Sequence, residues 1–390
     1  MRRVMDIKAL DKQYIANTYK RFDLDLVRGH KQFLYDSNGK QYIDMGSGIA
    51  VNSFGVADEQ WKQAIIAQLD KLQHTSNLYY TYPQVELAKL LCKKSGMSKV
   101  FFANSGAEAN ECAIKTARKY SSDKYGQDRH TIITLENSFH GRTVTTLSAT
   151  GQDVFHKHFG PFTQGFLHVK VNDTKEMEKH IKSGHVCAVM LELIQGEGGV
   201  IPLDKDYVAN TEKLCKENDV LLIIDEVQTG IGRTGAFYSY MRYEIQPDIV
   251  TSAKGLGGGL PIGATLFNEK THNVLDYGSH GSTFGGNPVC CAGAISVVSR
   301  INNKLLKDVL EKEKIVRELL QGAKGVQSIS GTGLMLAVKT EKDAKEIVEK
   351  CMANGVLFLT AKDKIRMLPP LNICKKSLAK AVKVLKEACE

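Results

Sequence analysis

The sequence predicts an α/β fold, with a large domain built on a mostly parallel sheet and a smaller α+β domain at the C-terminus. Short apolar runs typical of buried strands alternate with segments whose apolar residues have helical spacing, which indicates a parallel sheet covered by helices. After residue 287 the pattern changes to a long amphipathic stretch, two or three short strands and a lysine-rich terminal helix. We therefore expect an N-terminal segment, 1–50, that packs with the small domain, a large domain, 51–286, and the small domain, 287–390.

Each element has its own signal. A hairpin is predicted around the Asn38-Gly39 turn, and apolar residues at helical spacing predict helices near 61–72 and 85–91. In the large domain, strands are expected at 100–102, 132–133, 188–191, 220–224 and 249–250. In the small domain, the amphipathic pattern of 301–320 is followed by expected strands at 334–338, 356–359 and 365–368.

Composition excludes several classes of protein. The chain has 390 residues, of which 43% are hydrophobic and 24% charged, as in an ordinary globular protein. The net charge of +9 comes from lysines dispersed among acids, so we interpret it as solvated helix faces and expect no nucleic-acid partner. No apolar run is long enough to span a bilayer, and no signal-peptide core follows the first residues, so we expect no membrane association.

The nine cysteines are scattered and contain no C-x-x-C motif. This pattern favours reduced thiols and a cytoplasmic protein over a disulfide framework or a zinc site. His156 and His158 form an H-x-H pair without neighbouring cysteines or acids, so we expect no metal centre there.

The strand at 220–224 ends abruptly in Asp225, which places a carboxylate where open α/β sheets bind their ligands. An ionised acid in a dry crevice needs a cationic partner, and the protonated ring nitrogen of pyridoxal phosphate is one. Lys254 follows the strand at 249–250 and precedes a glycine-rich run, where lost hydration would favour the amine form that makes Schiff bases. Either residue alone is more commonly a turn cap or a surface lysine, so the interpretation depends on further motifs.

Two other strands are followed by candidate binding groups. Ser105 and Glu108 have capping-box spacing before a helix, whose free N–H groups and positive dipole end suit a phosphate. Phe139 and Arg142 follow the strand near 131–135, where the ring could stack on a cofactor and the guanidinium could hold a carboxylate. Taken alone, the first motif is more simply interpreted as a stable helix start. The second is as simply interpreted as a loop phenylalanine beside a solvent-facing arginine.

Residues 230–235, GIGRTG, match the G-x-G-x-x-G pattern of dinucleotide-binding proteins. Its context does not fit, because the glycines do not directly follow the strand and Asp225 and Glu226 lie where a pyrophosphate would bind. We therefore give the dinucleotide interpretation little weight.

Taken together, six motifs resemble those of the class III aminotransferases. They are spread over nearly the whole chain and follow one another in the same order as in that family. They are SGAEAN at 105–110, FHGRT at 139–143, QGEGG at 195–199, IDEVQTG at 224–230, SAKG at 252–255 and GSTFGGNP at 281–288. Within that class, GIAVN at 48–52, TSNLY at 75–79 and Phe139 resemble the acetylornithine aminotransferases.

The resemblance implies a fold-type-I homodimer whose large domain binds pyridoxal phosphate. Lys254 would form the Schiff base with the cofactor and move the substrate proton. Asp225 would pair with the pyridinium nitrogen, Gln228 with the phenolic oxygen, and Phe139 would stack on the ring.

The resemblance assigns the remaining binding groups as well. Gly106 and Ala107 would bind the phosphate, joined by Thr283 of the other subunit. Two further assignments concern substrates: Arg142 and Ser282 would contact acetylornithine, and Arg366 would bind the α-carboxylate of glutamate.

Glu197 is a candidate partner for the charge of Arg366. Without a partner, the charge of Arg366 would face the methylene groups of acetylornithine, and an unpaired charge against an apolar chain is energetically costly. Glu197 in the glycine-rich turn could pair with Arg366 and neutralise that charge. The simpler interpretation is an exposed turn acid. The sequence also departs from the family's Gly-His-x-His-Pro, because FGVAD stands at 54–58, and the local structure there cannot be inferred.

The implied reaction moves the terminal amino group of N-acetylornithine to 2-oxoglutarate, giving N-acetylglutamate semialdehyde and glutamate in arginine biosynthesis. Ornithine, succinyl-diaminopimelate and 4-aminobutyrate are alternative donors that the motifs barely separate. A racemase or aminomutase that uses pyridoxal phosphate is a further alternative, because the Schiff-base chemistry is shared on this fold.

Overall fold

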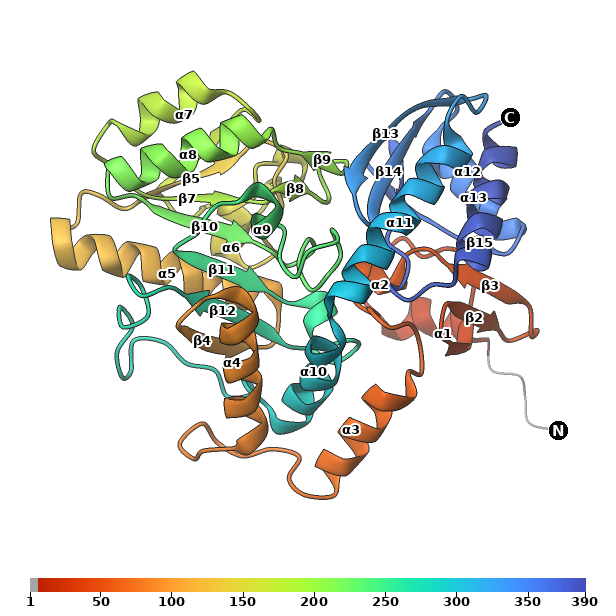
Figure 1. Cartoon of the computed structure of the whole chain (residues 1–390), viewed down its shortest axis with the longest axis horizontal. Helices are drawn as coiled ribbons and strands as arrows, with labels where there is room; N and C mark the ends of the chain where they lie inside the picture. Colours follow the sequence, from red (N-terminus) through yellow and green to blue (C-terminus); the bar gives the residue numbers. More distant parts are fainter. Residues whose placement is uncertain (1–5) are drawn as a thin grey trace.

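The computed structural model describes residues 6–390 and has a large and a small part joined along one side (Figure 1). The large part is built on a seven-stranded sheet with the order β4-β12-β11-β10-β7-β5-β6, in which only β12 runs antiparallel to its neighbours. This confirms the predicted α/β class with a mostly parallel sheet. The strands are β4 (Lys99–Ala103), β5 (Thr131–Leu135), β6 (Phe166–Val169), β7 (Val186–Leu191), β10 (Leu221–Asp225), β11 (Ile249–Ser252) and β12 (Gly263–Phe267).

Strand β10 is buried on both faces, as its continuous apolar run predicts. Leu221 and Ile223 pack in the core beneath helix α5 (Gly106–Tyr125), whereas Leu222 and Ile224 point into the larger core on the other side. This alternation follows from the two-residue period of a strand. Asp225 at the end of β10 therefore lies at the edge of the sheet between two packed layers of helices.

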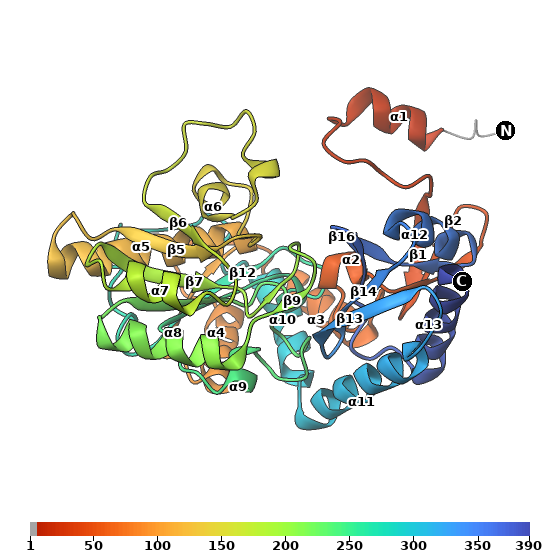
Figure 2. The ribbon, with the colours of Figure 1, turned by 90° about the horizontal axis from the view of Figure 1, so that it is seen from above.

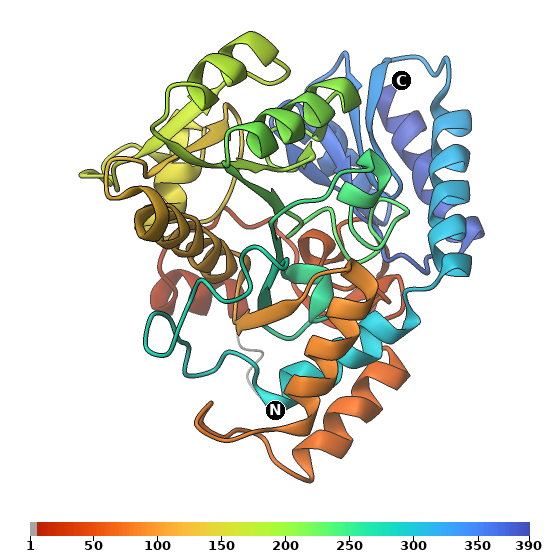
Figure 3. The ribbon, with the colours of Figure 1, turned by 60° about the vertical axis from the view of Figure 1, so that its left-hand side comes forward.

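Helices cover both faces of this sheet. Helix α5 packs along β11 and β12, and α8 packs against β10. Figure 3 shows α10 (Pro288–Arg300) and α11 (Asn303–Leu320) running in succession from the large part toward the small one. The other helices of the large part are α3 (Glu59–Leu69), α4 (Tyr82–Ser95), α6 (Val144–Ala149), α7 (Thr174–Ile181), α8 (Lys205–Glu217), α9 (Tyr240–Tyr243) and α10 (Pro288–Arg300), with short 3-10 turns η1 (Asp153–Phe155) and η2 (Lys254–Leu256).

The C-terminal part contains an antiparallel sheet of order β13-β14-β17-β16. Its elements are α11 (Asn303–Leu320), β13 (Val326–Thr332), β14 (Met335–Thr340), α12 (Ala344–Ala353), β16 (Leu359–Ala361), β17 (Lys364–Met367) and α13 (Lys375–Cys389). Strand β17 carries Arg366 toward the large part. Residues 230–235 form a buried loop, in which the Arg233 side chain donates to the carbonyl oxygens of Leu334 and Pro369 and so links the two parts.

The N-terminal segment forms the predicted hairpin and more. Strands β2 (Phe33–Asp36) and β3 (Gln41–Asp44) are antiparallel, and β15 (Val356–Leu357) of the C-terminal region pairs with β3 in parallel. The remaining elements of this N-terminal segment are α1 (Ile7–Tyr14), β1 (Leu26–His30) and α2 (Ser47–Ala50). The large part also contains a two-stranded sheet, β8 (Ile194–Gln195) with β9 (Ile201–Pro202). Figure 2 shows α1 standing away from the body. The division at residues 50 and 286 stays a prediction.

The unusual FGVAD stretch at 54–58 makes defined backbone contacts. Val56 pairs with Lys31 in an isolated antiparallel bridge, and Asp58 caps helix α3 by accepting from the Trp61 N–H. Gly55 has a φ of +80°, and a Cβ there would lie 2.5 Å from the Lys31 carbonyl oxygen, so only glycine fits. Within residues 6–390, none of the helices combines the length and apolarity needed to cross a bilayer.

Candidate active site

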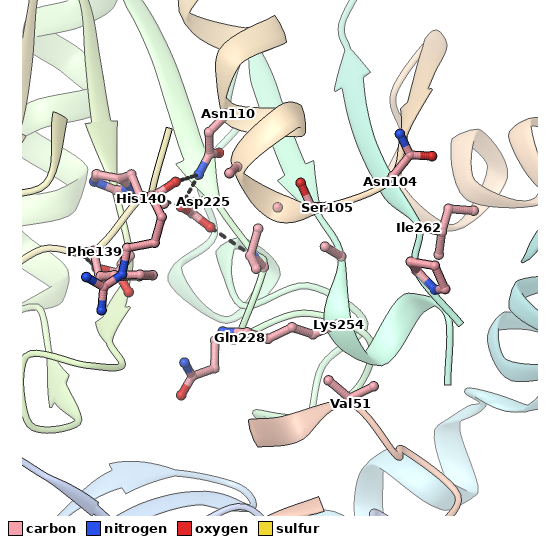
Figure 4. Close-up of a pocket in the computed structure, with 18 of the residues that line it drawn as sticks. Val51, Asn104, Ser105, Asn110, Phe139, His140, Asp225, Gln228, Lys254 and Ile262 are labelled. Atoms are coloured by element: carbon pink, nitrogen blue, oxygen red, sulfur yellow. Dashed lines mark hydrogen bonds and ion pairs between the residues drawn. The ribbon is translucent and has the colours of Figure 1, made fainter. Parts of the chain in front are cut away.

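A cavity of about 490 Å³ opens at the sheet edge where β4, β5, β10 and β11 end (Figure 4). Because parallel strands present their carboxyl ends on the same edge, groups that are distant in the sequence meet here. The cavity brings together seven of the sequence-predicted residues, namely Gly106, Ala107, Phe139, Arg142, Asp225, Gln228 and Lys254.

Asp225 is only 4% exposed and is held by three donors. Its Oδ2 accepts from Asn110 Nδ2 and from His140 Nδ1, both at 2.8 Å, and its Oδ1 accepts from the Val227 N–H at 3.0 Å. Neither Asn110 nor His140 is among the residues predicted from the sequence. Asn110 lies one turn into α5, on the side that faces the sheet, and its contact with Asp225 is visible only in the tertiary structure.

A second buried acid, Glu192, was also missed. Its carboxylate accepts from the Phe139 N–H at 2.8 Å and from the Gly196 N–H at 3.1 Å, so it links two loops of the site. Burial raises the pKa of Glu192 to about 7, although the nearby His140 opposes this shift. Burial by itself would lower the pKa of His140, but the hydrogen bond to Asp225 and the negative charges of Asp225 and Glu192 together outweigh burial and raise the pKa above the usual value.

The N-terminus of α5 forms one end of the cavity. Ser105 is its N-cap and accepts from the Glu108 N–H at 3.2 Å, as predicted. The reciprocal half of the capping box differs, because the Glu108 carboxylate accepts from the Asn104 N–H rather than from that of Ser105. A Cβ on Gly106 would lie 2.7 Å from Val227 Cγ1, so the backbone approaches Val227 more closely than any other residue would allow.

Lys254 begins the 3-10 turn η2 directly after β11 and has a φ of +45°, a backbone conformation that non-glycine residues rarely adopt. Burial lowers its pKa, and the positive charge of Arg366 acts in the same direction against the opposing charges of Glu197 and Asp225. A lower pKa increases the fraction of neutral amine, which is the nucleophilic and basic form.

Arg366 on β17 is 3% exposed and pairs with Glu197 in the glycine-rich turn. One guanidinium nitrogen, Nη1, donates to Glu197 Oε1 at 2.6 Å and to Gln228 Oε1 at 3.3 Å. Burial would raise the pKa of Glu197, but the charge and hydrogen bond of Arg366 lower it below the usual value. Glu197 is therefore paired with Arg366 rather than a free turn acid, and its role toward the substrates stays a prediction.

Ser282 and Thr283 lie outside this cavity. Ser282 Oγ accepts from Asn104 Nδ2 at 3.2 Å and from the Gly285 N–H at 2.9 Å, next to the cavity wall at Asn104. Thr283 is exposed on the surface of the chain. Their predicted roles stay predictions.

A sequence model of the class-III aminotransferases matches residues 14–389 of the chain. The chain belongs to the class-III aminotransferase family. It is 54% identical over 381 residues to an acetylornithine aminotransferase of Haemophilus ducreyi, and the match covers 97% of each chain. The resemblance carried by the six motifs is thereby confirmed.

Solved structures agree with this assignment. The aminotransferase is similar to the ornithine aminotransferase of Toxoplasma gondii, with a TM-score of 0.94, 31% identity and coverage of 98% of this chain and 94% of that one. It is also similar to an acetylornithine aminotransferase from Elizabethkingia anophelis, with a TM-score of 0.88, 33% identity and coverage of 98% of both chains.

Class-III aminotransferases depend on pyridoxal phosphate, and the site of this aminotransferase fits that cofactor. The start of α5 provides N–H groups and a positive dipole end for a phosphate, with Gly106 leaving room for close approach. Asp225 supplies a fixed, buried carboxylate for a protonated ring nitrogen, and Phe139 supplies an aromatic wall. Lys254 supplies an amine in the same cavity.

Proposed function

We propose that this aminotransferase transfers the terminal amino group of N-acetylornithine to 2-oxoglutarate, giving N-acetylglutamate semialdehyde and glutamate in arginine biosynthesis. The observation that carries this assignment is that, in the part of the chain that the structure describes, one of two arginines is free and the other is paired with an acid. Arg142 is exposed at the cavity, whereas Arg366 is buried and covered by Glu197. The 54% identity to an acetylornithine aminotransferase supports the same donor.

The two arginines suit two different donors. N-acetylornithine has its carboxylate far from the reacting amine, and the atoms next to that amine are uncharged methylene groups. It therefore needs a free cation only at the site of the remote carboxylate. Arg142 supplies that cation, and the pair of Glu197 and Arg366 presents no unpaired charge to the methylene groups. Glutamate has a carboxylate next to its reacting carbon, so Glu197 would have to swing away to release Arg366.

Lys254 performs the proton transfer in this proposal. When bound, pyridoxal phosphate supplies an electron sink for the carbon that loses its proton. Lys254 holds the cofactor and, as a neutral amine, accepts and returns a proton at that carbon, which its lowered pKa favours. Asp225, fixed by Asn110 and His140, keeps the proton on the ring nitrogen, and Gln228 would contact the phenolic oxygen.

Single-turnover half-reactions test the donor directly. The holoenzyme would be mixed with N-acetylornithine, ornithine, succinyl-diaminopimelate or 4-aminobutyrate, and the absorbance of the cofactor would be followed. The proposal expects the highest kcat/KM with N-acetylornithine. A higher value for ornithine or another donor would reassign the enzyme. Repeated turnover of a donor without any 2-oxo acid would indicate a mutase or racemase, because an aminotransferase stops after one half-reaction without an acceptor.

We also propose a cytoplasmic homodimer with shared active sites. Asn77 donates to the carbonyl oxygens of Ser282 and Gly285 and so holds its segment beside Thr283. The exposed aromatic side chains of that segment and of Phe284 support a subunit contact there; they are Tyr79, Tyr80, Tyr82 and Phe284. The free cysteines, most of them buried, support a reducing compartment.

A further inference from the structure

The guanidinium of Arg142 lies against two aromatic rings. Its Cζ is 4.2 Å from the centroid of the Phe155 ring and 5.6 Å from that of Phe139. The two rings meet edge to face, with centroids 5.7 Å apart and an interplanar angle of 75°. Both distances to Arg142 lie within the range of cation–π attraction, and Phe155 is the closer ring.

Phe155 is anchored in spite of its position in a surface segment. It ends the short turn η1, and the residues just before it are tied to the loop that carries Phe139. Gln152 Nε2 donates to the Ser138 carbonyl oxygen at 3.0 Å, and the Gly151 N–H donates to Ser138 Oγ at 3.0 Å. Phe155 and Phe139 are therefore held as one unit beside the cavity; Figure 2 shows the segment after α6 rising from the body.

An aromatic partner has a specific consequence for an arginine. An acid would orient the guanidinium but would also occupy its N–H donors and cancel its charge, as Glu197 does for Arg366. A ring face orients it by stacking and leaves the edge donors available for a bidentate carboxylate. Arg142 makes no ion pair within the described residues 6–390, which fits an arginine kept ready for a ligand.

We propose that Phe155 is a specificity-determining positioning residue, whose ring holds the Arg142 guanidinium in place for the remote carboxylate of the amino donor. The inference rests on the proposed function for the identity of that carboxylate. Phe155 itself makes no contact with substrate; it acts through Arg142.

Binding of an unreactive ligand tests the proposal apart from turnover. 2-Acetamidopentanoate has the carboxylate and acetamide of N-acetylornithine but no terminal amine, and its dissociation constant for the holoenzyme can be measured by calorimetry. Phe155→Leu keeps an apolar side chain without the ring and should weaken binding roughly 3- to 30-fold. Phe155→Tyr should restore it. Phe159→Leu is the matched control, because Phe159 is an exposed phenylalanine in the same segment.

A double-mutant cycle separates positioning from general packing. In an Arg142→Ala background, Phe155→Leu should cause no further loss of 2-acetamidopentanoate affinity. The half-reactions of 5-aminopentanoate and pentylamine, which differ only in the remote carboxylate, provide a second readout. Phe155→Leu should lower the ratio of their kcat/KM values by a similar factor, mainly because the carboxylate-bearing amine binds more weakly and its KM rises.

The proposal is overturned if Phe155→Leu binds 2-acetamidopentanoate like wild type, or if its effect persists unchanged in the Arg142→Ala background. It is also overturned if Phe155→Leu lowers both amine half-reactions equally and weakens cofactor binding, because the ring would then act through Phe139. Failure of the proposed function has a different signature. In that case the wild type would not transaminate N-acetylornithine, while the preference for 5-aminopentanoate over pentylamine would still depend on Phe155.

Discussion

Arg366 and Glu197 are 169 positions apart in the chain and form a charged pair with a shortest N–O distance of 2.6 Å. Arg366 comes from the C-terminal antiparallel sheet, and Glu197 comes from a loop of the large part. Each side chain also lies near Gln228 at the cavity wall. We propose that the pair controls whether a positive charge is offered next to the reacting carbon.

Glu197→Ala should impair the half-reaction with N-acetylornithine more than that with glutamate. Without its partner, Arg366 would present a bare charge to the methylene chain of the first donor, while glutamate would find the arginine already free. The discrimination between N-acetylornithine and glutamate should change by about 1–3 kcal/mol, which is roughly tenfold or more in the ratio of their kcat/KM values. Stopped-flow half-reactions with each donor measure this, and equal losses for both would show that Glu197 is not a gate.

Lys254→Ala should reduce turnover by more than about 10⁴-fold, because it removes both the attachment point of the cofactor and the proton-transfer group. Lys254→Arg, which keeps the charge but not a nucleophilic amine, should be equally inactive. Borohydride treatment of the wild type should fix the cofactor on the peptide that contains Lys254. Finding the label on any other lysine would refute the assignment.

Thr283 is expected to serve the phosphate site of the neighbouring subunit. Mixing a Thr283→Ala chain with a Lys254→Ala chain would give heterodimers with one doubly defective and one intact site, so activity should return. Mixing Asp225→Ala with Lys254→Ala is the control, because both residues line the same cavity and no intact site can form. Stable Thr283/Lys254 heterodimers without activity would contradict a cross-subunit role.

Gly106→Ala should weaken binding of pyridoxal phosphate. The added Cβ would lie 2.7 Å from Val227 Cγ1, so either the start of α5 or the strand end near Asp225 must shift. Such overpacking costs about 1–3 kcal/mol. Fluorescence titration of the cofactor-free protein measures the affinity, and its urea unfolding curve shows how much of the loss is general destabilisation. An unchanged affinity would mean that close backbone approach is not needed here.

The contribution of Glu192 to the stability of the cofactor-free protein should fall as pH rises from about 4.5 to about 7. Folding raises the pKa of Glu192 from 4.5 to about 7, so in this window the folded protein keeps a proton that the unfolded chain has released. The raised pKa of His140 acts in the same direction, since its stabilising contribution is lost as pH rises through the folded value.

Glu192→Gln should therefore flatten this pH dependence in urea unfolding experiments. Glu178→Gln, at a surface salt bridge of α7, is the matched control and should leave the slope unchanged. A slope that stays the same in Glu192→Gln would show that Glu192 does not titrate with folding.

The sequence by itself determined the fold class, the family and seven of the residues that line the cavity. The buried run ending in Asp225, the strand before Lys254 and the cap before Gly106 are local signals, because period, capping and strand ends depend on neighbouring residues. Strand ends on one sheet edge must also meet, which is why these groups could be expected to share a cavity.

The tertiary structure decided the contacts between segments that no local pattern connects. Asn110 and His140 on Asp225, Glu192 between two loops, and Phe155 against Arg142 all depend on how helices and loops pack around the sheet. A hydrogen bond or ring contact requires an approach of a few ångströms in a defined direction. Chain spacing does not set that approach, whereas the packed core does.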